Sequence, residues 1–593
     1  MGKKIVKGSS SNGKSTMKEA LKSIGIKKSK DVNDRKLKKK DFRDILWNYP
    51  IYISKLFKSL IPLSYIVLFA IVGISISFLL DSEVVARILN GSGSENTFTE
   101  GSVGAISTFN PLFVSVNYVD KAVQELVFDR FIYISKDGEP LPGIAESWSV
   151  SSDRLEYRFK IKEDVFWHNG TPLTIEDILF TFDTAKALSE EFGFDSVGVS
   201  LIGVDVSKDG GDVVFKLSEP NPTFFEAVSL FIVPKSRLEN VDLSQMAFDM
   251  FSRYPIGTGR YMVTRTEQNT VFLQDNKYDS RECDIQNIVF KVFPDKQSME
   301  MSFRIGVLDA IGSWDYELLK FTEEYSNLSS FKKVENYRTK LLFFNTRRGT
   351  YKGKEIRLAL NYLINKAALL ENSGIGGVVR KGPFPEDSWA FNSNIDYYAY
   401  DPEKAAEILN NLGFTKDEES GYFENDQEEI LSFTISYFDS VTNERLISIL
   451  KELLKNEGVV LKGEKLNYNQ ITQEIIATRD FDILLYEVET TVDPDQYNLW
   501  HSLKSNYPDL NISGYSYERV DILLEDARKT SQRNVRKEKY DLVQKYIMAD
   551  SPVIFLYNPT FHYFVKDNIK GVDLSDINYS YERFKNIQDW YFE

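Results

Sequence analysis

The strongest constraint on the fold is the stretch from Gly138 to Phe182, in which the spacing of apolar residues changes from that of a strand to that of a helix. Residues 155–162 alternate apolar and charged side chains, the period of a half-buried antiparallel strand. Asn169-Gly170 indicates a tight turn. Thr174 followed by Asp177 is a variant of the capping box, so we expect a helix directly after it. The stretch therefore predicts a domain that combines strands and helices.

The charge of the chain is unevenly distributed. Residues 1–58 contain 17 Lys and Arg against five Asp and Glu, whereas the whole chain has a net charge of −15. The part that follows the uncharged residues 59–80 is therefore strongly acidic, which argues against nucleic-acid binding. A chain of 593 residues is too long for one ordinary core, and we expect two or three lobes.

Residue types that build metal, disulfide and catalytic sites are scarce. Cys283 is the single cysteine, which excludes an internal disulfide. The three histidines, His168, His501 and His562, are far apart and show no metal-ligand spacing. The sequence has no HExxH motif, no G-x-S-x-G elbow and no Cys–His pairing. We therefore predict no enzyme, no catalytic residue, no metal and no cofactor.

Gly8 to Ser15 match the phosphate-binding pattern GxxxxGK[ST], but the required context is missing. Such a loop lies between a buried strand and a helix, in a sheet that also supplies a magnesium carboxylate. Fewer than 60 residues precede the apolar run that follows, far fewer than a nucleotide-binding domain needs. We interpret this match as chance.

Leu60 to Leu80, LIPLSYIVLFAIVGISISFLL, contains no charged residue. Its length suits a membrane-spanning helix, which needs about 20 residues. A cleaved signal peptide is the alternative, but the long basic leader and the acidic Asp81 and Glu83 at the place of a cleavage site argue against it. The basic residues before the run place that side in the cytoplasm. We predict a single-pass cell-membrane protein whose C-terminal domain is extracytoplasmic.

Four later segments carry further signals of fold. The two glycines of Pro255 to Tyr261, PIGTGRY, suit a turn with positive φ. A core-facing helical stripe is predicted by Leu360, Leu363, Ile364 and Ala367. Asp401 to Gly413 has the N-cap, N1 proline and terminal glycine of a complete helix. Phe481 to Tyr486 is an apolar run typical of a buried strand. Three more helices are expected at residues 121–134, 517–531 and 535–549.

These segments together resemble a known family. LPGIAESW, FWHNGTPLTIEDILFTF, PIGTGRY, the GVLDA of residues 306–310, the FFNT of residues 343–346 and the DSPVIFLY of residues 550–557 resemble, in order and spacing, the large extracellular solute-binding proteins of ABC importers. This is family 5, which includes oligopeptide-, dipeptide- and nickel-binding proteins. Val103 to Phe113 resembles its opening strand, and the likeness extends to about residue 572. Arg260 stands where the family usually has proline.

The resemblance implies a fold and a set of boundaries. The expected fold is α/β and two-lobed, periplasmic-binding-protein-like of the large class II type, with a hinge cleft, here preceded by one transmembrane helix. The expected divisions are a basic cytoplasmic segment at 1–59, a transmembrane helix at 60–80, a tether at 81–102, lobe I at 103–338, lobe II at 339–556 and a return to lobe I at 557–593.

The resemblance also implies a mechanism. A solute that touches both lobes favours the closed state, because only there does it gain both sets of contacts. The closed form, expected to be a monomer, would dock on ABC permease subunits in the membrane and release a peptide or another small polar solute. For peptides the family uses strand addition, in which main-chain hydrogen bonds supply the affinity.

The expected ligand site lies at the end of the strand near residue 486. Peptide-binding members carry an aspartate three positions before the acid of a D-P-D segment, where it pairs with the amino group of the ligand. This chain has Thr490 there, so the amine anchor is missing. The candidate ligand-binding residues are Tyr486, Glu487, Glu489, Thr490, Thr491, Trp389 and Asn110. Glu487 and Glu489 could equally be solvated acids at the end of a strand and bind no ligand. Trp389 could equally be an ordinary core residue.

The missing anchor leaves the ligand open. A peptide bound through its main chain is one hypothesis, and a blocked peptide, a glycan or another polar solute is a second. A third is a membrane-tethered sensor or assembly protein that uses the same fold without transport, with the basic cytoplasmic head making its contacts.

Overall fold

The computed structural model describes residues 96–115, 117–192, 203–279, 281–314, 328–467 and 469–593, with residues 197 and 201. The predicted basic segment 1–59 and transmembrane helix 60–80 lie outside these residues, as does most of the predicted tether. No helix within the described ranges combines the length and the apolar character that crossing a bilayer requires. All described residues belong to one compact unit.

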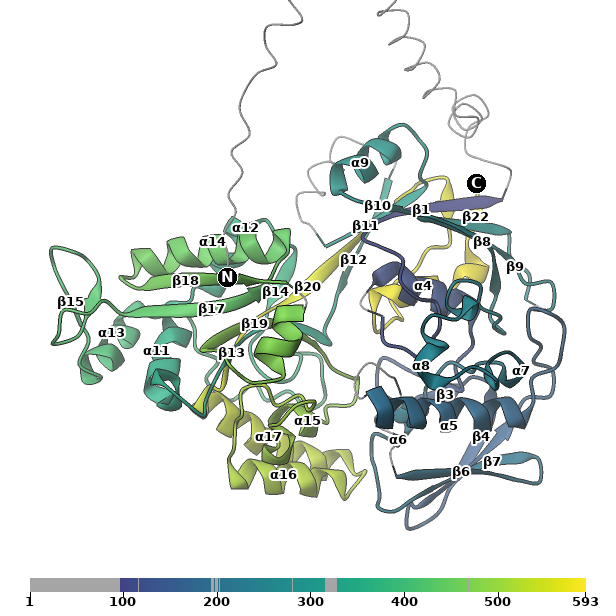
Figure 1. The fold of residues 1–593 in the computed structure, drawn as a ribbon, viewed down its shortest axis with the longest axis horizontal. Coiled ribbons are helices and arrows are strands. Elements are labelled where there is room, and N and C mark those ends of the chain that lie inside the picture. Colours follow the sequence, from purple (N-terminus) through teal and green to yellow (C-terminus); the bar gives the residue numbers. More distant parts are fainter. Residues whose placement is uncertain are drawn as a thin grey trace, which may run out of the picture. The chain divides into compact units, whose positions relative to one another are not determined.

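Two hydrophobic cores divide this unit into two lobes (Figure 1). The core of lobe I draws its residues from 98–310 and 561–590, and the core of lobe II from 341–557. The chain therefore leaves lobe I once and returns to it once. The two-lobed α/β architecture expected from the sequence is confirmed.

One twelve-stranded sheet runs through both lobes. Its strands are β1 (Thr97–Val103), β8 (Tyr261–Glu267), β9 (Thr270–Asp275), β10 (Asn287–Phe293), β11 (Ala310–Ser313), β12 (Leu328–Val334), β13 (Arg338–Phe344), β14 (Gly377–Val379), β17 (Ser432–Phe438), β18 (Val460–Leu466), β19 (Ile483–Glu489) and β20 (Val553–Lys566). They follow the order β18-β17-β19-β13-β20-β11-β1-β10-β9-β8, with β12 and β14 also paired to β20. β20 pairs antiparallel with β13 in lobe II and with β11 and β12 in lobe I. The crossing chain is therefore part of the sheet and not a loose linker.

Lobe I adds a four-stranded antiparallel sheet to its half of the large one. The four strands of this sheet are β4 (Ala145–Val150), β5 (Glu156–Ile161), β6 (Val204–Asp209) and β7 (Asp212–Leu217). Lobe I also has two two-stranded sheets, which consist of β2 (Ile132–Ile134) with β3 (Pro140–Pro142) and of β21 (Ile569–Lys570) with β22 (Tyr591–Phe592). Its helices are α4 (Tyr118–Val127), α5 (Ile175–Phe192), α6 (Phe224–Ala227), α7 (Lys235–Leu238), α8 (Leu243–Met246), α9 (Lys296–Arg304), η3 (Met250–Ser252), η7 (Ser580–Phe584) and η8 (Ile587–Asp589).

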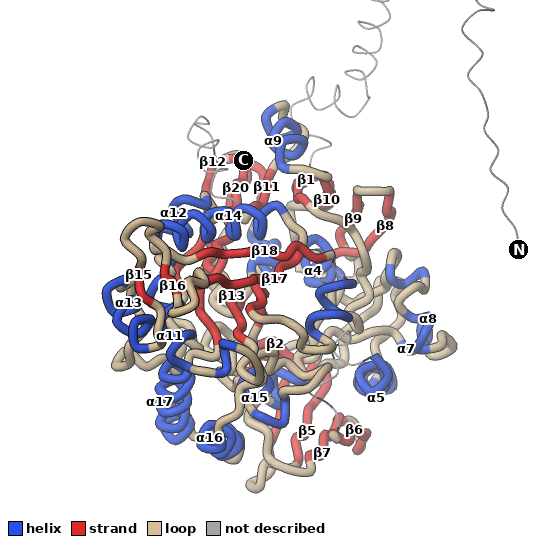
Figure 2. Tube along the Cα trace, turned by 60° about the vertical axis from the view of Figure 1, so that its left-hand side comes forward, coloured by secondary structure: helices blue, strands red, loops and turns tan. Residues whose placement is uncertain are grey.

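In lobe II, helices lie on both faces of the sheet (Figure 2). Besides the small hairpin β15 (Thr415–Lys416) and β16 (Phe423–Glu424), its elements are α11 (Lys354–Leu363), α12 (Lys366–Ser373), α13 (Pro402–Asn411), α14 (Val441–Asn456), α15 (Tyr497–Trp500), α16 (Glu518–Arg528), α17 (Arg533–Asp550), η4 (Thr350–Lys352), η5 (Gln470–Ile476) and η6 (Ser502–Lys504). α12 and α14 cover one face, and α11 and α13 lie on the other. Strands buried on both faces read as continuous apolar runs, which explains the predicted strand at 481–486.

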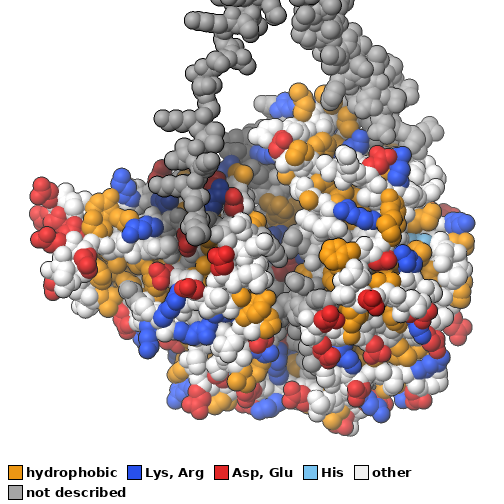
Figure 3. All heavy atoms as spheres, in the orientation of Figure 1, with side chains coloured by type: hydrophobic (Ala, Val, Ile, Leu, Met, Phe, Trp, Pro, Cys, Tyr) orange, Lys and Arg blue, Asp and Glu red, His pale blue; other side chains and the backbone are white. Residues whose placement is uncertain are grey.

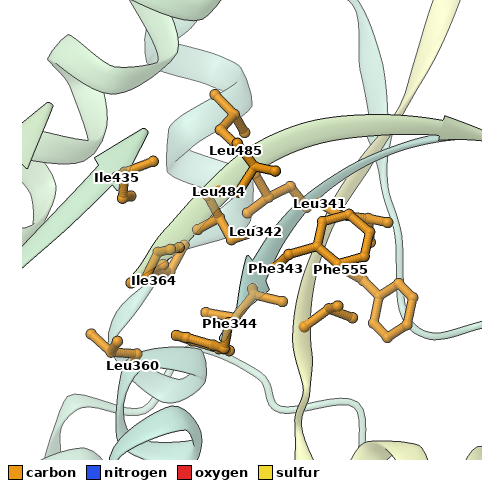
Figure 4. Packing of buried hydrophobic residues seen from close by; sticks show 14 of the residues in the cluster. Leu341, Leu342, Phe343, Phe344, Leu360, Ile364, Ile435, Leu484, Leu485 and Phe555 are labelled. Atoms are coloured by element: carbon orange, nitrogen blue, oxygen red, sulfur yellow. The ribbon is translucent and has the colours of Figure 1, made fainter. Parts of the chain in front are cut away.

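The predicted stripe on α11 is correct for three of its four residues. Leu360, Leu363 and Ile364 are buried, and Leu360 and Ile364 point toward the strands of lobe II (Figure 4). Ala367 is exposed, so its prediction was wrong. The reason is a break in the helix, because α11 ends at Leu363 and Asn365 caps a new helix by accepting the N–H of Ala368 at 2.9 Å.

The stretch 138–182 folds largely as predicted. β4 and β5 form an antiparallel pair, and Tyr157 and Phe159 on β5 are buried. α5 begins at Ile175, and both the N–H and the hydroxyl of Thr174 donate to the carboxylate of Asp177, at 2.9 and 2.8 Å. The two amphipathic helices of lobe II and the capped helix at Pro402 are also present.

Two predicted elements lie elsewhere. The opening strand is β1, Thr97–Val103, which lies almost wholly in the predicted tether and ends where the predicted strand 103–113 begins. Its position is set by parallel pairing with β10 over its full length. The helix predicted over 121–134 ends at Val127, because the chain turns to extended geometry at Phe128 and continues into β2.

The glycines of PIGTGRY serve a different purpose from the predicted one. Gly257 and Gly259 do not have positive φ. They are glycines because the turn lies against the end of α4: a Cβ on Gly257 would be 1.8 Å from the carbonyl oxygen of Val127. His168, from the tight turn before α5, holds the same segment. Its Nδ1 accepts the N–H of Gly257 at 3.2 Å, so Nε2 donates to the carbonyl of Gly259 at 3.0 Å.

We expect the hydrogen bonds of His168 to Gly257 and Gly259 to make the stability of lobe I sensitive to mild acid. Burial lowers the pKa of His168 from 6.5 to about 4. Because the pKa is depressed in the folded state, the full stability is present above pH 6.5 and is lost progressively as the pH falls toward 4. At pH 5.5 this group alone should reduce the free energy of unfolding by about 1.4 kcal/mol relative to pH 8. Urea unfolding at both pH values, compared between the wild type and His168→Gln, would measure this; an equal pH dependence in the two proteins would contradict it.

Candidate functional site

The end of β19 and the start of β13 in lobe II face α4 of lobe I. Glu489 on β19 accepts two hydrogen bonds from the ammonium of Lys121 on α4, at 3.1 and 3.2 Å. Lys121 also lies 4.8 Å from the ring centroid of Tyr581. These residues join segments that are more than 360 positions apart in the chain. Glu489 is thus a partner of the opposite lobe and not a free solvated acid.

Glu487 is held inside lobe II. Arg338 donates to its carboxylate through Nε at 3.0 Å and also through Nη2, and the ammonium of Lys340 lies 3.4 Å away. Burial raises the pKa of Glu487, but the two cations outweigh it and lower the pKa to about 2. The carboxylate is therefore ionised and already paired. Tyr486 is half-buried and packs against the lobe II core.

Thr490 contributes backbone groups at the position of the missing anchor. Its N–H donates to the carbonyl of Tyr337 at 2.7 Å, and its carbonyl accepts the hydroxyl of Tyr579, from lobe I, at 2.9 Å. Thr491 directly follows and lines a cavity with Val492. Of the predicted residues, the structure therefore brings Glu489, Thr490 and Thr491 to the boundary between the lobes.

Trp389 and Asn110 lie away from that cavity. Trp389 packs within lobe II against the ring of Tyr540 and the guanidinium of Arg536, which is 5.3 Å from its centroid. Asn110 is fully buried in lobe I, where its side-chain oxygen accepts the N–H of Leu112 at 3.1 Å. Neither residue is among those that line the cavity.

The cavity that Thr491 and Val492 line, at the boundary between the lobes, has a volume of about 980 Å³. Its walls come mostly from lobe I, and lobe II contributes Thr491 and Val492. Pockets for small ligands usually measure about 300–1,000 Å³, so this one can hold a small solute. The molecular surface is hollowed along the boundary between the lobes (Figure 3). Within the described part of the chain, no group of three or more His, Cys, Asp or Glu could hold a metal ion.

Several lining residues were not among the predicted ones. They include Glu226, Tyr579, Tyr581 and Glu582. Glu226 follows two phenylalanines on a helix of four residues, and the others belong to the C-terminal return segment. No spacing in the sequence connects residues 226 and 579, because they meet only after β20 has brought the chain back to lobe I.

Glu226 is the point at which the cavity wall meets the loop after β19. Its Oε1 accepts the N–H of Asp493 at 2.6 Å, across the lobe boundary. Asp493 is itself bound by Arg536, with Nη1 at 2.7 Å from Oδ2. Burial, and next the negative charge of Asp493, raise the pKa of Glu226 to about 8. This carboxyl group therefore carries a proton at neutral pH in the structure as it stands.

Further contacts link the lobes. Arg533 at the start of α17 donates to the carbonyl of Asp137 at 2.6 Å and to the carboxylate of Glu139 at 2.7 Å. Arg154 donates to the hydroxyl of Ser531. With Lys121–Glu489, Glu226–Asp493 and Tyr579–Thr490, they form a set of contacts that exists only while the lobes are together.

We expect Lys121→Met to shift the protein toward open forms. The pair is partly exposed, with 23% and 37% of the two side chains accessible, so its contribution is small. Loss of the pair should lower the ratio of closed to open molecules by at most about fivefold, or ~1 kcal/mol. Small-angle X-ray scattering should show a larger mean radius of gyration for the variant. Lys160→Met, which breaks a pair within lobe I, is the control; equal radii for both variants would contradict the expectation.

Comparisons with known proteins agree with this geometry. A family model described as bacterial extracellular solute-binding proteins, family 5 Middle, matches residues 139–509. The oligopeptide-binding protein AppA of Bacillus subtilis is 25% identical over 513 residues, covering 83% of this chain and 90% of AppA. The dipeptide-binding protein of Escherichia coli is 23% identical over 516 residues, covering 82% of this chain and 94% of that protein.

Solved structures show the same similarity. The crystal structure of NikZ from Campylobacter jejuni in complex with Ni(L-His) superposes with a TM-score of 0.71 and 26% identity, covering 84% of this chain and 100% of NikZ. The structure of AppA from Bacillus subtilis in complex with a nonapeptide gives a TM-score of 0.70 and 24% identity, covering 84% and 99% of the two chains.

Proposed function

The chain belongs to family 5 of the bacterial extracellular solute-binding proteins, and from this we propose that it captures a peptide-like solute between its two lobes and delivers it to the permease of an ABC importer. The observation that carries the proposal is the cavity of about 980 Å³, which lies at the lobe boundary and touches both lobes. Similarity to proteins named for oligopeptide and dipeptide binding supports the ligand class.

In this proposal the lobes close on the solute. Several contacts between the lobes are polar, and the exposed ion pairs among them are weak by themselves, so a solute that adds contacts to both lobes can decide the equilibrium. The hinge would be the turn at residues 335–337, between β12 and β13, together with residues 558–559 of β20, where Asn558 donates to the carbonyls of Glu335 and Asn336 at 3.0 and 3.1 Å. The ligand-contacting residues would include Thr490 and Thr491, with Glu489 acting through Lys121.

The membrane anchor is part of the same proposal. The uncharged residues 60–80 would span the membrane once, with the basic head in the cytoplasm and the two lobes outside. An anchored receptor would remain close to its permease. The excess of 17 basic over five acidic residues in the head favours a second candidate, a tethered sensor or assembly protein without transport.

Native mass spectrometry of the full chain, purified in detergent, tests the proposal. We expect a bound small molecule or, after its removal, an increase in melting temperature with a tripeptide pool, because ligand binding to the folded state stabilises it. A protein that carries no small molecule and shows no thermal shift with the pool would contradict solute capture and favour the sensor.

A further inference from the structure

Glu226 is a half-buried residue of the cavity wall, and one of its two carboxyl oxygens lacks a hydrogen-bond partner among the described residues. Oε1 accepts the N–H of Asp493, whereas Oε2 is inaccessible to solvent and has no hydrogen-bond partner among the residues that the structure describes. Glu226 lines the cavity together with Thr491 and Val492. A buried polar atom without a partner is costly and uncommon in native proteins, so such an atom in a ligand cavity indicates a group that the ligand supplies.

We propose that Glu226 binds a positively charged ammonium group of the solute through Oε2, and so supplies from lobe I the carboxylate that Thr490 does not supply from lobe II. This inference rests on the proposed function and specifies its ligand as one that carries a primary amine.

The charges around the cavity favour a cation at this point. Three of the six other carboxylates of the wall have cationic partners: Glu125 pairs with Arg130, Glu146 with Lys160 at 2.5 Å, and Asp279 with Arg281 at 2.9 Å. Glu226 has no such partner among the described residues. A cation from the solute would complete the pairing.

The groups that face Glu226 increase the negative potential. Asp493 and Asp495 both raise its pKa. Their cations are engaged, since Arg536 binds Asp493 and Arg528 donates to Asp495 at 2.7 Å. The remaining neighbours are the hydroxyls of Thr491, Tyr337 and Tyr579, which bring no positive charge. An anionic group would be repelled at this position, and an ammonium would be attracted.

The position of Glu226 couples binding of the ammonium group to closure of the lobes and to release of a proton from the carboxyl group. The bond from Asp493 to Glu226 crosses the lobe boundary, so Glu226 has its full environment only in the closed protein. With a pKa of about 8, the group is protonated at pH 7. An ammonium group favours the charged carboxylate, so its binding should release close to one proton at pH 7, where a peptide amine is itself mostly charged.

Isothermal titration calorimetry of the full chain in detergent tests the inference. The probes are trialanine and N-acetyl-trialanine, and each is titrated at pH 7 in two buffers of different ionisation enthalpy. The proteins are the wild type, Glu226→Gln and Glu219→Gln. Glutamine at 226 keeps the acceptor for Asp493 and removes the charge, and Glu219 is an exposed carboxylate just before α6 that serves as the control.

The wild type and Glu219→Gln should bind trialanine at least tenfold more tightly than the acetylated form, with release of close to one proton. In Glu226→Gln the affinity for trialanine should fall about 10- to 100-fold, and the preference and the proton release should both disappear. Equal binding of the two probes by the wild type, or a preference that persists in Glu226→Gln, would overturn the inference and leave the proposed function standing. Binding of neither probe by the wild type would count against both.

Discussion

Gly257→Ala is expected to lower the free energy of unfolding by at least about 3 kcal/mol. The new Cβ would lie 1.8 Å from the carbonyl oxygen of Val127 and 2.7 Å from its carbonyl carbon. That oxygen also accepts the N–H of Gly259 at 2.9 Å, so the turn cannot move away without losing this bond. Urea unfolding of the full chain in detergent, followed by tryptophan fluorescence, measures the effect.

Gly211→Ala is the matched control for this substitution. Gly211 lies in the turn between β6 and β7, and a Cβ there would have nothing within 4 Å. A Gly→Ala change at an unstrained position usually stabilises by about 0.4–1 kcal/mol, because it restricts the unfolded chain. If the two variants unfolded at the same urea concentration, the close packing of α4 against the PIGTGRY turn would not be what requires glycine.

Arg583→Met is expected to destabilise lobe I by about 3–5 kcal/mol. Arg583 and its partner Glu100 have side-chain exposures of 0% and 1%. The guanidinium donates to Glu100 through Nε at 3.1 Å and through Nη2, and the hydroxyl of Tyr563 donates to the same carboxylate at 2.7 Å. Removing the arginine leaves a buried carboxylate without its counter-ion. The melting temperature and urea unfolding of the full chain should both report the loss.

A double variant separates the buried charge from the lost packing. Glu100→Gln combined with Arg583→Met removes the uncompensated charge and should be more stable than Arg583→Met alone. Lys465→Met, at a surface ion pair with Asp439 at 2.9 Å, should change the stability by less than about 1 kcal/mol. A double variant no more stable than the single one would mean that packing of the methylene groups, and not the charge, explains the loss.

Local signals predicted the elements that are determined by neighbours in sequence. The capping box at Thr174, the apolar run at 481–486 and the complete helix at 402–411 fold as expected. One prediction was wrong because a distant partner decides the outcome: β1 starts at Thr97 because β10 pairs with it. The prediction for Ala367 missed a local signal, the start of a second helix at Lys366.

The candidate site was harder to predict from the sequence, because more of its contacts join residues that are far apart in the chain. The sequence pointed to residues 486–491, and the structure brings Glu489 and Thr490 to the lobe boundary. It did not point to Glu226, which no motif marks. It also suggested that Glu487 and Glu489 could be solvated acids, whereas one is bound by Arg338 and Lys340 and the other by Lys121.

Periodicity and motifs along the chain were enough to identify the family, the two-lobed α/β architecture and the absence of the aspartate at position 490. The packing of distant segments was needed to show why Gly257 must be glycine, and that Glu226 of the opposite lobe lines the cavity and accepts the N–H of Asp493. The physical reason is the sheet that crosses both lobes. β20 returns the chain to lobe I and sets side by side groups that are hundreds of residues apart, so their contacts leave no local pattern in the sequence.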